Sequence, residues 1–214
     1  MRDSEGCSAV TRKVRADVTS AADRRCLIDT VIGSSGRLDV LVNTVGEFSR
    51  ERARFADYDA ERIESLVTSN FTSAMMLDLL ALPHLRKSQA GRIIHFGFGR
   101  AAEAPAWPQR AVYAAAKAGL MSFTKTLAAE EIAHHVTVNM VCPGEIKGRN
   151  KELTINEVRG TDDPENPGVR LGAGEDVARV VAFLCELDSE YLTGTVIDVA
   201  GGLDPIRALK TATK

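Results

Sequence analysis

The chain has 214 residues, 44% of them hydrophobic, which suits one α/β domain over residues 1–214 with a substantial buried core. Acidic and basic residues are interspersed and leave a formal net charge of −2, so neither a basic face for nucleic acid nor an acidic tail is indicated. The apolar runs are too short to span a bilayer, no secretory signal is recognisable, and four scattered cysteines indicate a reduced cytoplasmic protein without a metal site.

Short β-branched runs alternate with longer helical patterns along the whole chain. In chain order they predict a strand at 9–18, a helix at 20–36, a strand at 38–46, a long helix at 57–87, a strand at 91–97, a helix at 111–133, a strand at 136–144, a loop at 144–174, a helix at 174–187 and a strand at 194–202. This alternation predicts an α/β fold with a doubly wound parallel sheet.

A Gly-x-Gly-x-x-Ala pattern follows the strand at 91–97, at Gly97, Gly99 and Ala102. In a dinucleotide-binding turn, a helix would begin at the third small residue and an acid would end the next strand. Pro105 and Pro108 interrupt any such helix, and the next strand runs into Cys-Pro-Gly. We therefore do not assign phosphate binding to this turn.

Tyr113 and Lys117 lie four residues apart in an Ala-rich helical pattern, so their side chains share one helix face. Such a pair alone is most often an ordinary surface pair. Its position after a strand and an irregular segment, and before a strand ending in Pro-Gly, favours a functional role for the pair. A tyrosine beside a cation can exchange protons more readily, because the cation favours the phenolate and lowers the pKa.

Sequence motifs along the whole chain also favour a functional role for Tyr113 and Lys117. They are ADVT at 16–19, GRLDVLVNTVG at 36–46, VTSNFTSAM at 67–75, YAAAKAGL at 113–120, VTVNMVCPGEI at 136–146 and LGAGEDVARVVAFLCELDSEYLTGTVIDVAGG at 171–202. In order and spacing they resemble the short-chain dehydrogenase/reductase family, most closely its 3-oxoacyl-ACP reductase branch. The resemblance implies a Rossmann-like sheet and an oxidoreductase that interconverts a small-molecule carbonyl and an alcohol with NAD or NADP.

The resemblance also implies the catalytic roles. Tyr113 would donate the proton in reduction and accept it in oxidation, while Lys117 would supply positive charge and hold the nicotinamide ribose. Asn70 would anchor a water that connects Lys117 to solvent; alternatively, it is a helix asparagine that binds backbone. Trp107 could line the substrate mouth or simply pack in the core.

The cofactor contacts follow from the same motifs. The resemblance implies Asp17, Val18, Asn43, Val45, Gly46, Tyr113, Lys117, Pro143, Gly144 and Ile146. Asp17 and Val18 would contact adenine, although Asp17 could instead be an acid that stabilises a helix N-terminus. Asn43 is expected to tie neighbouring strands together, and Gly46 to let the cofactor pass closely. Pro143, Gly144 and Ile146 would flank the nicotinamide.

The sequence departs from the family pattern at three places. The Thr-Gly-x-x-x-Gly-x-Gly turn and the first two βα units have no counterpart, so the preference between NAD and NADP is not readable. The family serine before the tyrosine falls at Gly97 or Phe98, and residues 93–112 contain no Ser or Thr. The threonine after Pro-Gly-x-Ile is replaced around Lys147, with Thr154 further along. We expect a serine at 97 or 98 to raise activity.

Two alternatives to an active enzyme stay open: a relative that has lost its chemistry but acts as an oligomer subunit, and an incomplete chain. The family forms its dimers through two helices. We therefore expect a homodimer or homotetramer, with Met75, Met76, Leu120 and Phe123 on the exposed apolar faces. We also expect the 214-residue chain to be only weakly stable, because the strand at 38–46 would be an unpaired apolar edge.

Overall fold

A computed structural model describes residues 11–48, 52–203 and 206. Its central sheet contains four parallel strands: β1 (Val40–Asn43), β2 (Gly91–Phe96), β3 (Val136–Pro143) and β6 (Val196–Val199). Their order is β1-β2-β3-β6, so the strands that follow one another in the chain mostly lie side by side. All carboxyl ends therefore meet at one edge of the sheet, as the sequence predicts.

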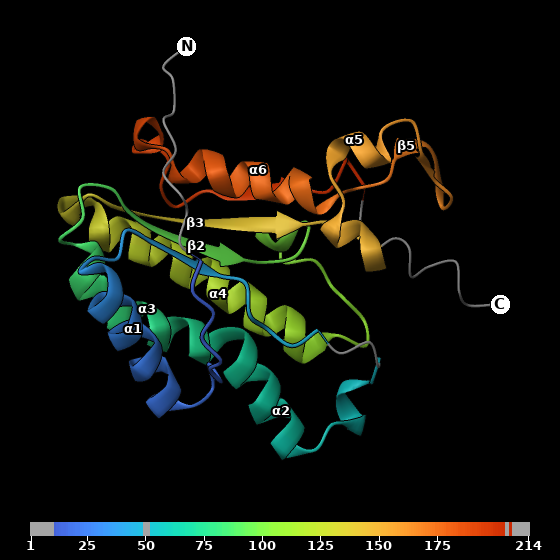
Figure 1. Cartoon of the computed structure of the whole chain (residues 1–214). Coiled ribbons are helices and arrows are strands. Elements are labelled where there is room, and N and C mark those ends of the chain that lie inside the picture. Colours follow the sequence, from blue (N-terminus) through green and yellow to red (C-terminus); the bar gives the residue numbers. More distant parts are fainter. Residues whose placement is uncertain (1–10, 49–51, 204–205, 207–214) are drawn as a thin grey trace, which may run out of the picture.

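Helices cover both faces of this sheet (Figure 1). They are α1 (Ala21–Ser35), α2 (Ala60–Val67), α3 (Ser73–Leu85), α4 (Ala111–Glu131) and α6 (Gly174–Cys185). Neighbouring residues of β2 point to opposite faces: Ile93 packs in the core with α1, α3 and α4, and Ile94 packs with Val177 and Leu184 of α6. The doubly wound α/β fold is confirmed.

The ends of α1 follow from local chemistry. Ser20 caps the helix by accepting a hydrogen bond from the Asp23 backbone N–H at 3.3 Å. Gly36 ends it with φ of 71°, and its N–H donates to the Ile32 carbonyl at 2.8 Å. A strand was predicted at 9–18, just before this helix. For residues 11–17, which the structure describes, this prediction is wrong, because they form neither strand nor helix. Alternating valines alone cannot form a strand without a partner for their backbone groups.

The long helix expected at 57–87 is present over Ala60–Leu85, and a π-helical segment divides it into α2 and α3. It begins at Ala60, because Asp59 accepts a hydrogen bond from the Arg62 N–H, and α2 passes into a π-helical segment, Thr68–Thr72, before α3. A π segment inserts an extra residue into a turn and often occurs at functional sites. Asn70 lies at its centre with only 1% of its surface exposed.

The segment Ala60–Leu85 is long and apolar enough, by length and hydropathy alone, to cross a membrane. In this fold its α3 portion buries Leu77, Ala81 and Leu85, and Pro83 lies one turn or less from its end. The core of this α/β fold therefore accounts for much of its apolar character.

The apolar helix faces differ from the expectation for oligomer contacts. Leu120 is 1% exposed and belongs to the core, while Met75 and Phe123 are half-buried. Met76 is exposed, and so is Leu79, which the sequence analysis did not single out. The prediction was wrong for Leu120 because the inner face of α4 packs on the sheet.

The region 144–174, expected to be a loop, contains short elements: a three-ten turn (Gly148–Glu152), α5 (Ile155–Val158) and an antiparallel pair, β4 (Asp162–Asp163) and β5 (Asn166–Arg170). A capping box formed by Thr154 and Glu157 begins α5. The Thr-x-x-Glu spacing that marks it is visible in the sequence.

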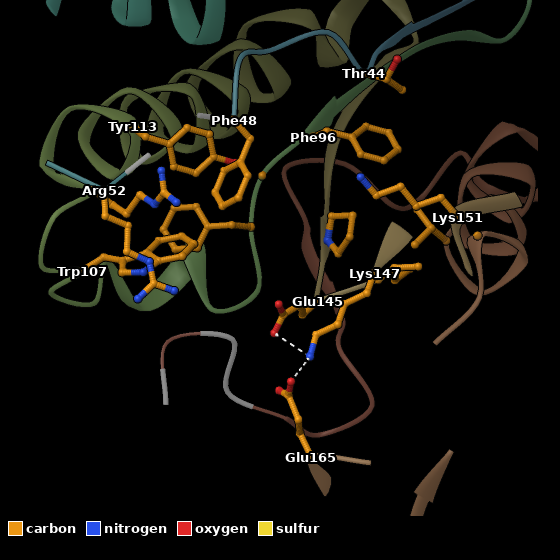
Figure 2. Close-up of a pocket in the computed structure, with 18 residues that line it drawn as sticks. Thr44, Phe48, Arg52, Phe96, Trp107, Tyr113, Glu145, Lys147, Lys151 and Glu165 are labelled. Atoms are coloured by element: carbon orange, nitrogen blue, oxygen red, sulfur yellow. Dashed lines mark ion pairs between the residues drawn. The ribbon is translucent and has the colours of Figure 1, made fainter. Parts of the chain in front are cut away.

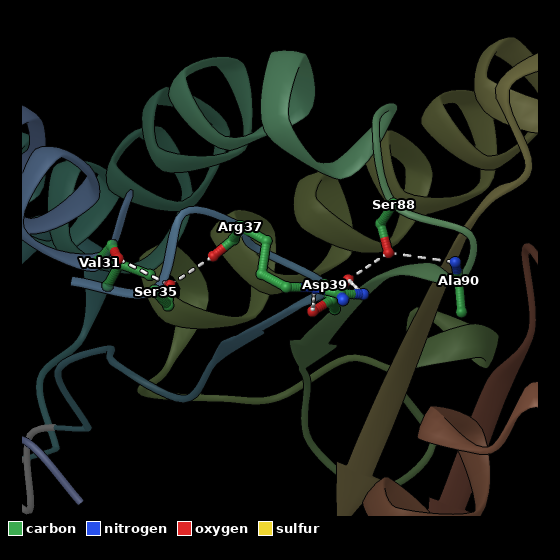
Figure 3. A network of polar contacts seen from close by, with 6 residues as sticks. All are labelled: Val31, Ser35, Arg37, Asp39, Ser88 and Ala90. Carbon is green, nitrogen blue, oxygen red and sulfur yellow. Dashed lines mark hydrogen bonds and ion pairs between the residues drawn. The ribbon is translucent and has the colours of Figure 1, made fainter. Parts of the chain in front are cut away.

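Polar contacts fix the amino-terminal end of the sheet (Figure 3). The Ser35 hydroxyl donates to the Arg37 carbonyl at 2.7 Å, and the Arg37 guanidinium pairs with Asp39 just before β1. The Ser88 hydroxyl donates to the same Asp39 carboxylate and accepts from the Ala90 N–H at 3.1 Å. These contacts hold the beginnings of β1 and β2 together, at the end opposite to the cavity described below.

A second set of polar side chains lies inside the fold, and we call it the buried polar cluster: Asn43, Asp78, His95 and Thr124. Asp78 accepts a hydrogen bond from Asn43 Nδ2 at 2.9 Å, and its other oxygen lies 2.8 Å from His95 Nε2. His95 Nδ1 lies 2.8 Å from the Thr124 hydroxyl. The cluster therefore joins β1 and β2 to α3 and α4, whereas Asn43 was expected to tie neighbouring strands to each other.

Candidate active site

A cavity of about 710 Å³ lies at the carboxyl ends of the parallel strands (Figure 2). Thr44 follows β1, Gly97 follows β2 and Gly144 follows β3, and all three line it. This is where open α/β sheets place their ligands. The cavity also contains Tyr113, near the start of α4.

Three residues from separate elements meet beside this cavity: Gly46 after β1, Asn70 in the π segment and Lys117 on α4. A Cβ atom placed on Gly46 would lie 2.6 Å from Asn70 Oδ1 and 3.1 Å from Lys117 Nζ. Any side chain at position 46 would therefore collide with the asparagine. Glycine is required here because the neighbouring side chains approach the backbone closely. The backbone conformation does not require it, since the φ of Gly46 is not positive.

Asn70 has one satisfied and one unsatisfied end. Its Nδ2 donates to the Leu66 carbonyl at 3.1 Å and to the Glu47 carbonyl at 3.0 Å. Its Oδ1 is buried and has no hydrogen-bond partner among residues 11–48, 52–203 and 206. The amide nitrogen thus binds backbone, as one alternative expects, and the unpartnered oxygen leaves the expected water-anchoring role a prediction.

Burial controls the ionisation of the tyrosine–lysine pair. It lowers the pKa of Lys117, which is 5% exposed, to about 8. It raises the pKa of Tyr113 to about 12, with a smaller contribution from Cys142. The cation that opposes the rise in the Tyr113 pKa is Arg110, whereas we expected Lys117 in that role. At neutral pH the phenol is protonated, and the pair can donate protons.

Aromatic side chains are concentrated in this cavity. The chain has seven Phe, three Tyr and one Trp, and four of these form what we call the aromatic cluster: Phe48, Phe98, Trp107 and Tyr113. Ring centroids are 4.9 Å apart for Phe98–Trp107 and 5.1 Å for Phe48–Tyr113. Trp107 therefore both lines the cavity and packs. Its Nε1 is buried without an acceptor in the described part of the chain.

The position of the absent family serine is filled by apolar packing. Phe98 is 5% exposed and contacts the aromatic cluster. A Cβ on Gly97 would lie 2.6 Å from Cys142 Sγ and 2.9 Å from Met140 Sδ. A serine at 97 would therefore have to displace these two sulfur atoms, so this packing argues against the expectation that it would raise activity.

The other residues implied by the resemblance fall into two groups. Pro143, Gly144 and Ile146 line the cavity together with Tyr113. Asp17 and Val18 lie before α1 and are not lining residues: Asp17 Oδ1 accepts hydrogen bonds from the Thr19 N–H at 2.9 Å and hydroxyl at 2.7 Å. These bonds lower the pKa of Asp17.

Val45 is 57% exposed, next to Gly46. Thr154, raised as a replacement for the missing threonine, accepts a hydrogen bond from the Glu157 N–H at 3.3 Å and donates to the Glu157 carboxylate at 2.7 Å. It is thus engaged in capping α5.

Charged residues that the sequence analysis missed complete the cavity. Lys147 Nζ lies 2.6 Å from Glu165 and 4.0 Å from Glu145 on one side, as Figure 2 shows. Arg52 and Arg110 also line the cavity. Figure 2 shows Arg52 on the side of the aromatic cluster, and the Arg110 guanidinium carbon lies 4.6 Å from the centre of the Phe48 ring. No motif marks these residues, because their meeting depends on loops folded over the strand ends.

Comparison with known proteins gives consistent matches. Residues 2–204 match the family described as enoyl-(acyl carrier protein) reductase. The putative oxidoreductase YtkK of Bacillus subtilis is 42% identical over 199 residues, which cover 92% of this chain and 78% of that protein. The 3-oxoacyl-[acyl-carrier-protein] reductase FabG of Haemophilus influenzae is 35% identical, with 87% of this chain and 76% of FabG covered.

Solved structures agree. A putative 3-oxoacyl-reductase from Bacillus thuringiensis superimposes with a TM-score of 0.85 at 42% identity, covering 90% of this chain and 77% of that one. The acetoin dehydrogenase YohF from Salmonella typhimurium gives a TM-score of 0.77 at 29% identity, covering 94% and 77%. The activities for which these relatives are named, reductase and dehydrogenase, are both oxidoreductase activities.

Proposed function

The chain belongs to the short-chain dehydrogenase/reductase family, and from this premise we propose that it is an NAD(P)-dependent oxidoreductase that interconverts a carbonyl and an alcohol. Tyr113 is the proposed acid–base group. One observation carries the proposal: Asn70 Oδ1 and Lys117 Nζ converge over Gly46 beside the cavity that contains Tyr113. These groups come from three separate elements of the fold.

The residues at this point fit the ribose and nicotinamide end of such a cofactor. A buried oxygen without a donor, a buried amine and a glycine that permits close approach suit a ligand rich in hydroxyl groups. Pro143, Gly144 and Ile146 are the proposed nicotinamide contacts, and Asp17 and Val18 the proposed adenine contacts. When bound, the nicotinamide would supply or accept the hydride.

The protein's own residues would donate the proton and replace it. In reduction, the Tyr113 hydroxyl donates its proton to the carbonyl oxygen as the carbon becomes that of an alcohol. A Tyr113 pKa of about 12 keeps the phenol protonated at neutral pH, which is the form that can act as the acid in reduction. Lys117 is charged below about pH 8 and is the proposed contact of the nicotinamide ribose, while Arg110 is the cation that favours the phenolate that remains. Asn70 Oδ1 can hold a water through which the tyrosine is reprotonated.

A catalytically impaired relative is the second candidate, and the packing at Phe98 favours it. The family serine would donate a hydrogen bond to the reacting oxygen, and loss of one such donor costs about 10²–10³ in rate. Phe98 cannot donate. We therefore expect slow turnover on ordinary ketones.

The proposal extends to assembly and location. A homodimer or homotetramer in the cytoplasm is the state that the family resemblance favours. Exposed Met76 and Leu79 on α3 support a contact through that helix.

The test is oxidation of NADH and NADPH by the purified chain against a panel of carbonyl compounds. Tyr113→Phe should lower turnover by at least about 100-fold, because it removes the proton donor and little else. Tyr191→Phe is the matched control, since this side chain is 99% exposed, and it should leave turnover unchanged. Full turnover by Tyr113→Phe would refute the assigned role. No oxidation by the wild type with any carbonyl would favour the impaired relative.

A further inference from the structure

Three aromatic rings surround Tyr113, the proposed acid–base group. The centroid of the Tyr113 ring lies 5.1 Å from that of Phe48. The ring centroids of Phe98 and Trp107 are each 6.0 Å from it. Phe48 follows β1, Phe98 follows β2 and Trp107 precedes α4, and all three line the cavity. Figure 2 shows Phe48 and Trp107 on the Tyr113 side, so rings from three segments form the wall beside the proposed reacting group.

The aromatic cluster is only partly covered by the rest of the chain. Phe48 is 51% exposed although its ring contacts Tyr113, and Trp107 is half-buried. The Arg110 guanidinium carbon lies 4.6 Å from the centre of the Phe48 ring, so a cation on this side already faces a ring. Burial of apolar surface is favourable, and an aromatic ring left half open in a cavity can be covered by an apolar ligand. The cluster therefore offers a binding surface as well as packing.

A ring also replaces the hydroxyl expected next to the reacting position. Phe98 stands where the family serine is expected, and it is 5% exposed within the cluster. Lys147, Glu145 and Glu165 pair with one another on the other side of the cavity. The Tyr113 side therefore favours a substrate whose body, beyond the carbonyl, is an apolar ring.

Building on the proposed function, we infer that the substrate is a ketone that carries an aromatic ring, which completes the aromatic cluster while the carbonyl oxygen receives the Tyr113 proton. Aromatic rings pair in tilted or edge-to-face arrangements with centroids about 4.5–7 Å apart, because their faces are negative and their edges positive. The rings of the cluster already pair at 4.9–6.2 Å with interplanar angles of 40–79°. An added aromatic ring can pair in the same way, whereas a saturated ring only fills the space.

The kinetic test compares 4-phenylbutan-2-one with 4-cyclohexylbutan-2-one, using NADH or NADPH. The same short chain separates ring and carbonyl in both ketones, so the carbonyl groups are equally reactive and only the ring differs. The cyclohexyl ketone is the more hydrophobic, and burial alone would favour it. We expect the phenyl ketone to have a kcat/KM about 3–10-fold higher, because only its ring can pair with the cluster. An equal or lower value would overturn the inference.

Phe48→Leu isolates the contribution of the ring. Leucine keeps an apolar side chain at this exposed position but removes the ring, so the kcat/KM values of the two ketones should become equal within about 2-fold. Phe55→Leu is the matched control, because Phe55 is 63% exposed and lies outside the cavity lining, and it should keep the wild-type preference. A preference that survives Phe48→Leu unchanged would contradict the role of the cluster.

Trp107 allows a binding test without turnover, because it is the only tryptophan of the chain. Its fluorescence is followed while each ketone is added to the wild type, Phe48→Leu and Phe55→Leu. We expect a saturable change with a Kd about 3–10-fold lower for the phenyl ketone in the wild type and in Phe55→Leu. In Phe48→Leu the two Kd values should be equal. Equal Kd values in the wild type would refute the aromatic substrate.

The aromatic substrate and the proposed function fail in distinguishable ways. Oxidation of NADH or NADPH with equal kcat/KM for the two ketones, or with a higher value for acetoacetyl-CoA, would refute the aromatic substrate and leave the oxidoreductase intact. Selective binding of the phenyl ketone without oxidation of either cofactor would support the ring site and count against the proposed reaction.

Discussion

The buried polar cluster and the candidate active site are both made of polar side chains inside the fold, but they differ in how well those groups are paired. In the cluster, Asp78, His95 and Thr124 are fully buried, and their mutual contacts are all 2.8 Å. In the site, Asn70 Oδ1 has no partner in the described residues, and burial lowers the pKa of Lys117 to about 8.

This difference separates structure from function. Buried polar groups that satisfy one another stabilise a fold and fix the relative position of its elements. Buried polar groups left unpaired cost stability, and they persist where a ligand or a reaction needs them. The cluster holds β1, β2, α3 and α4 together. Gly46 follows β1, Asn70 lies in the π segment that leads into α3, and Lys117 lies on α4. The buried polar cluster, whose groups are paired, thus helps to position the candidate active site, whose groups are not.

The largest effect on stability is expected in the cluster. Asp78→Ala leaves buried His95 and half-buried Asn43 without their partner and should lower the free energy of unfolding by about 3–5 kcal/mol. Urea unfolding followed by circular dichroism measures the change. Asp29→Ala, at an exposed position of α1, is the control and should have almost no effect. A loss below about 1 kcal/mol for Asp78→Ala would show that the cluster is not a stabilising unit.

A smaller effect on stability is expected at Gly97, where the candidate active site meets the end of β2. Gly97→Ser places a side chain against Cys142 Sγ and Met140 Sδ and should cost about 1–3 kcal/mol of stability without raising turnover. Gly33→Ser is the matched control, because a Cβ atom placed there would meet no other atom within 4 Å, and it should have little effect. If Gly97→Ser increases turnover at unchanged stability, the packing of this strand end is not as described.

Sequence patterns predicted the parts of the molecule that depend on neighbouring residues. Ser20 and Gly36 mark the ends of α1 because capping is local, and the four-residue spacing of Tyr113 and Lys117 places both on one helix face. The pairing of Asp78 with His95 could not be read in this way, since it depends on how α3 packs against β2. For the same reason the sequence did not show that Asn70 lies in a π segment or that Arg52 and Arg110 share a cavity.

The central claim is that the buried, unpaired polar groups of the candidate active site lower the stability of the fold and are needed for the reaction. Lys117→Met tests this claim most directly. Turnover and urea unfolding are measured on the same preparation. At pH 7 the wild type bears the full cost of a buried charge, because Lys117 is protonated in both the folded and the unfolded state. The variant should therefore be more stable by up to about 3 kcal/mol and should lose its turnover. Between pH 8 and 10.5 the folded wild type releases this proton first, so the difference in stability should shrink as the pH rises. A Lys117→Met protein that is less stable at pH 7, or that turns over as fast as the wild type, would contradict the account.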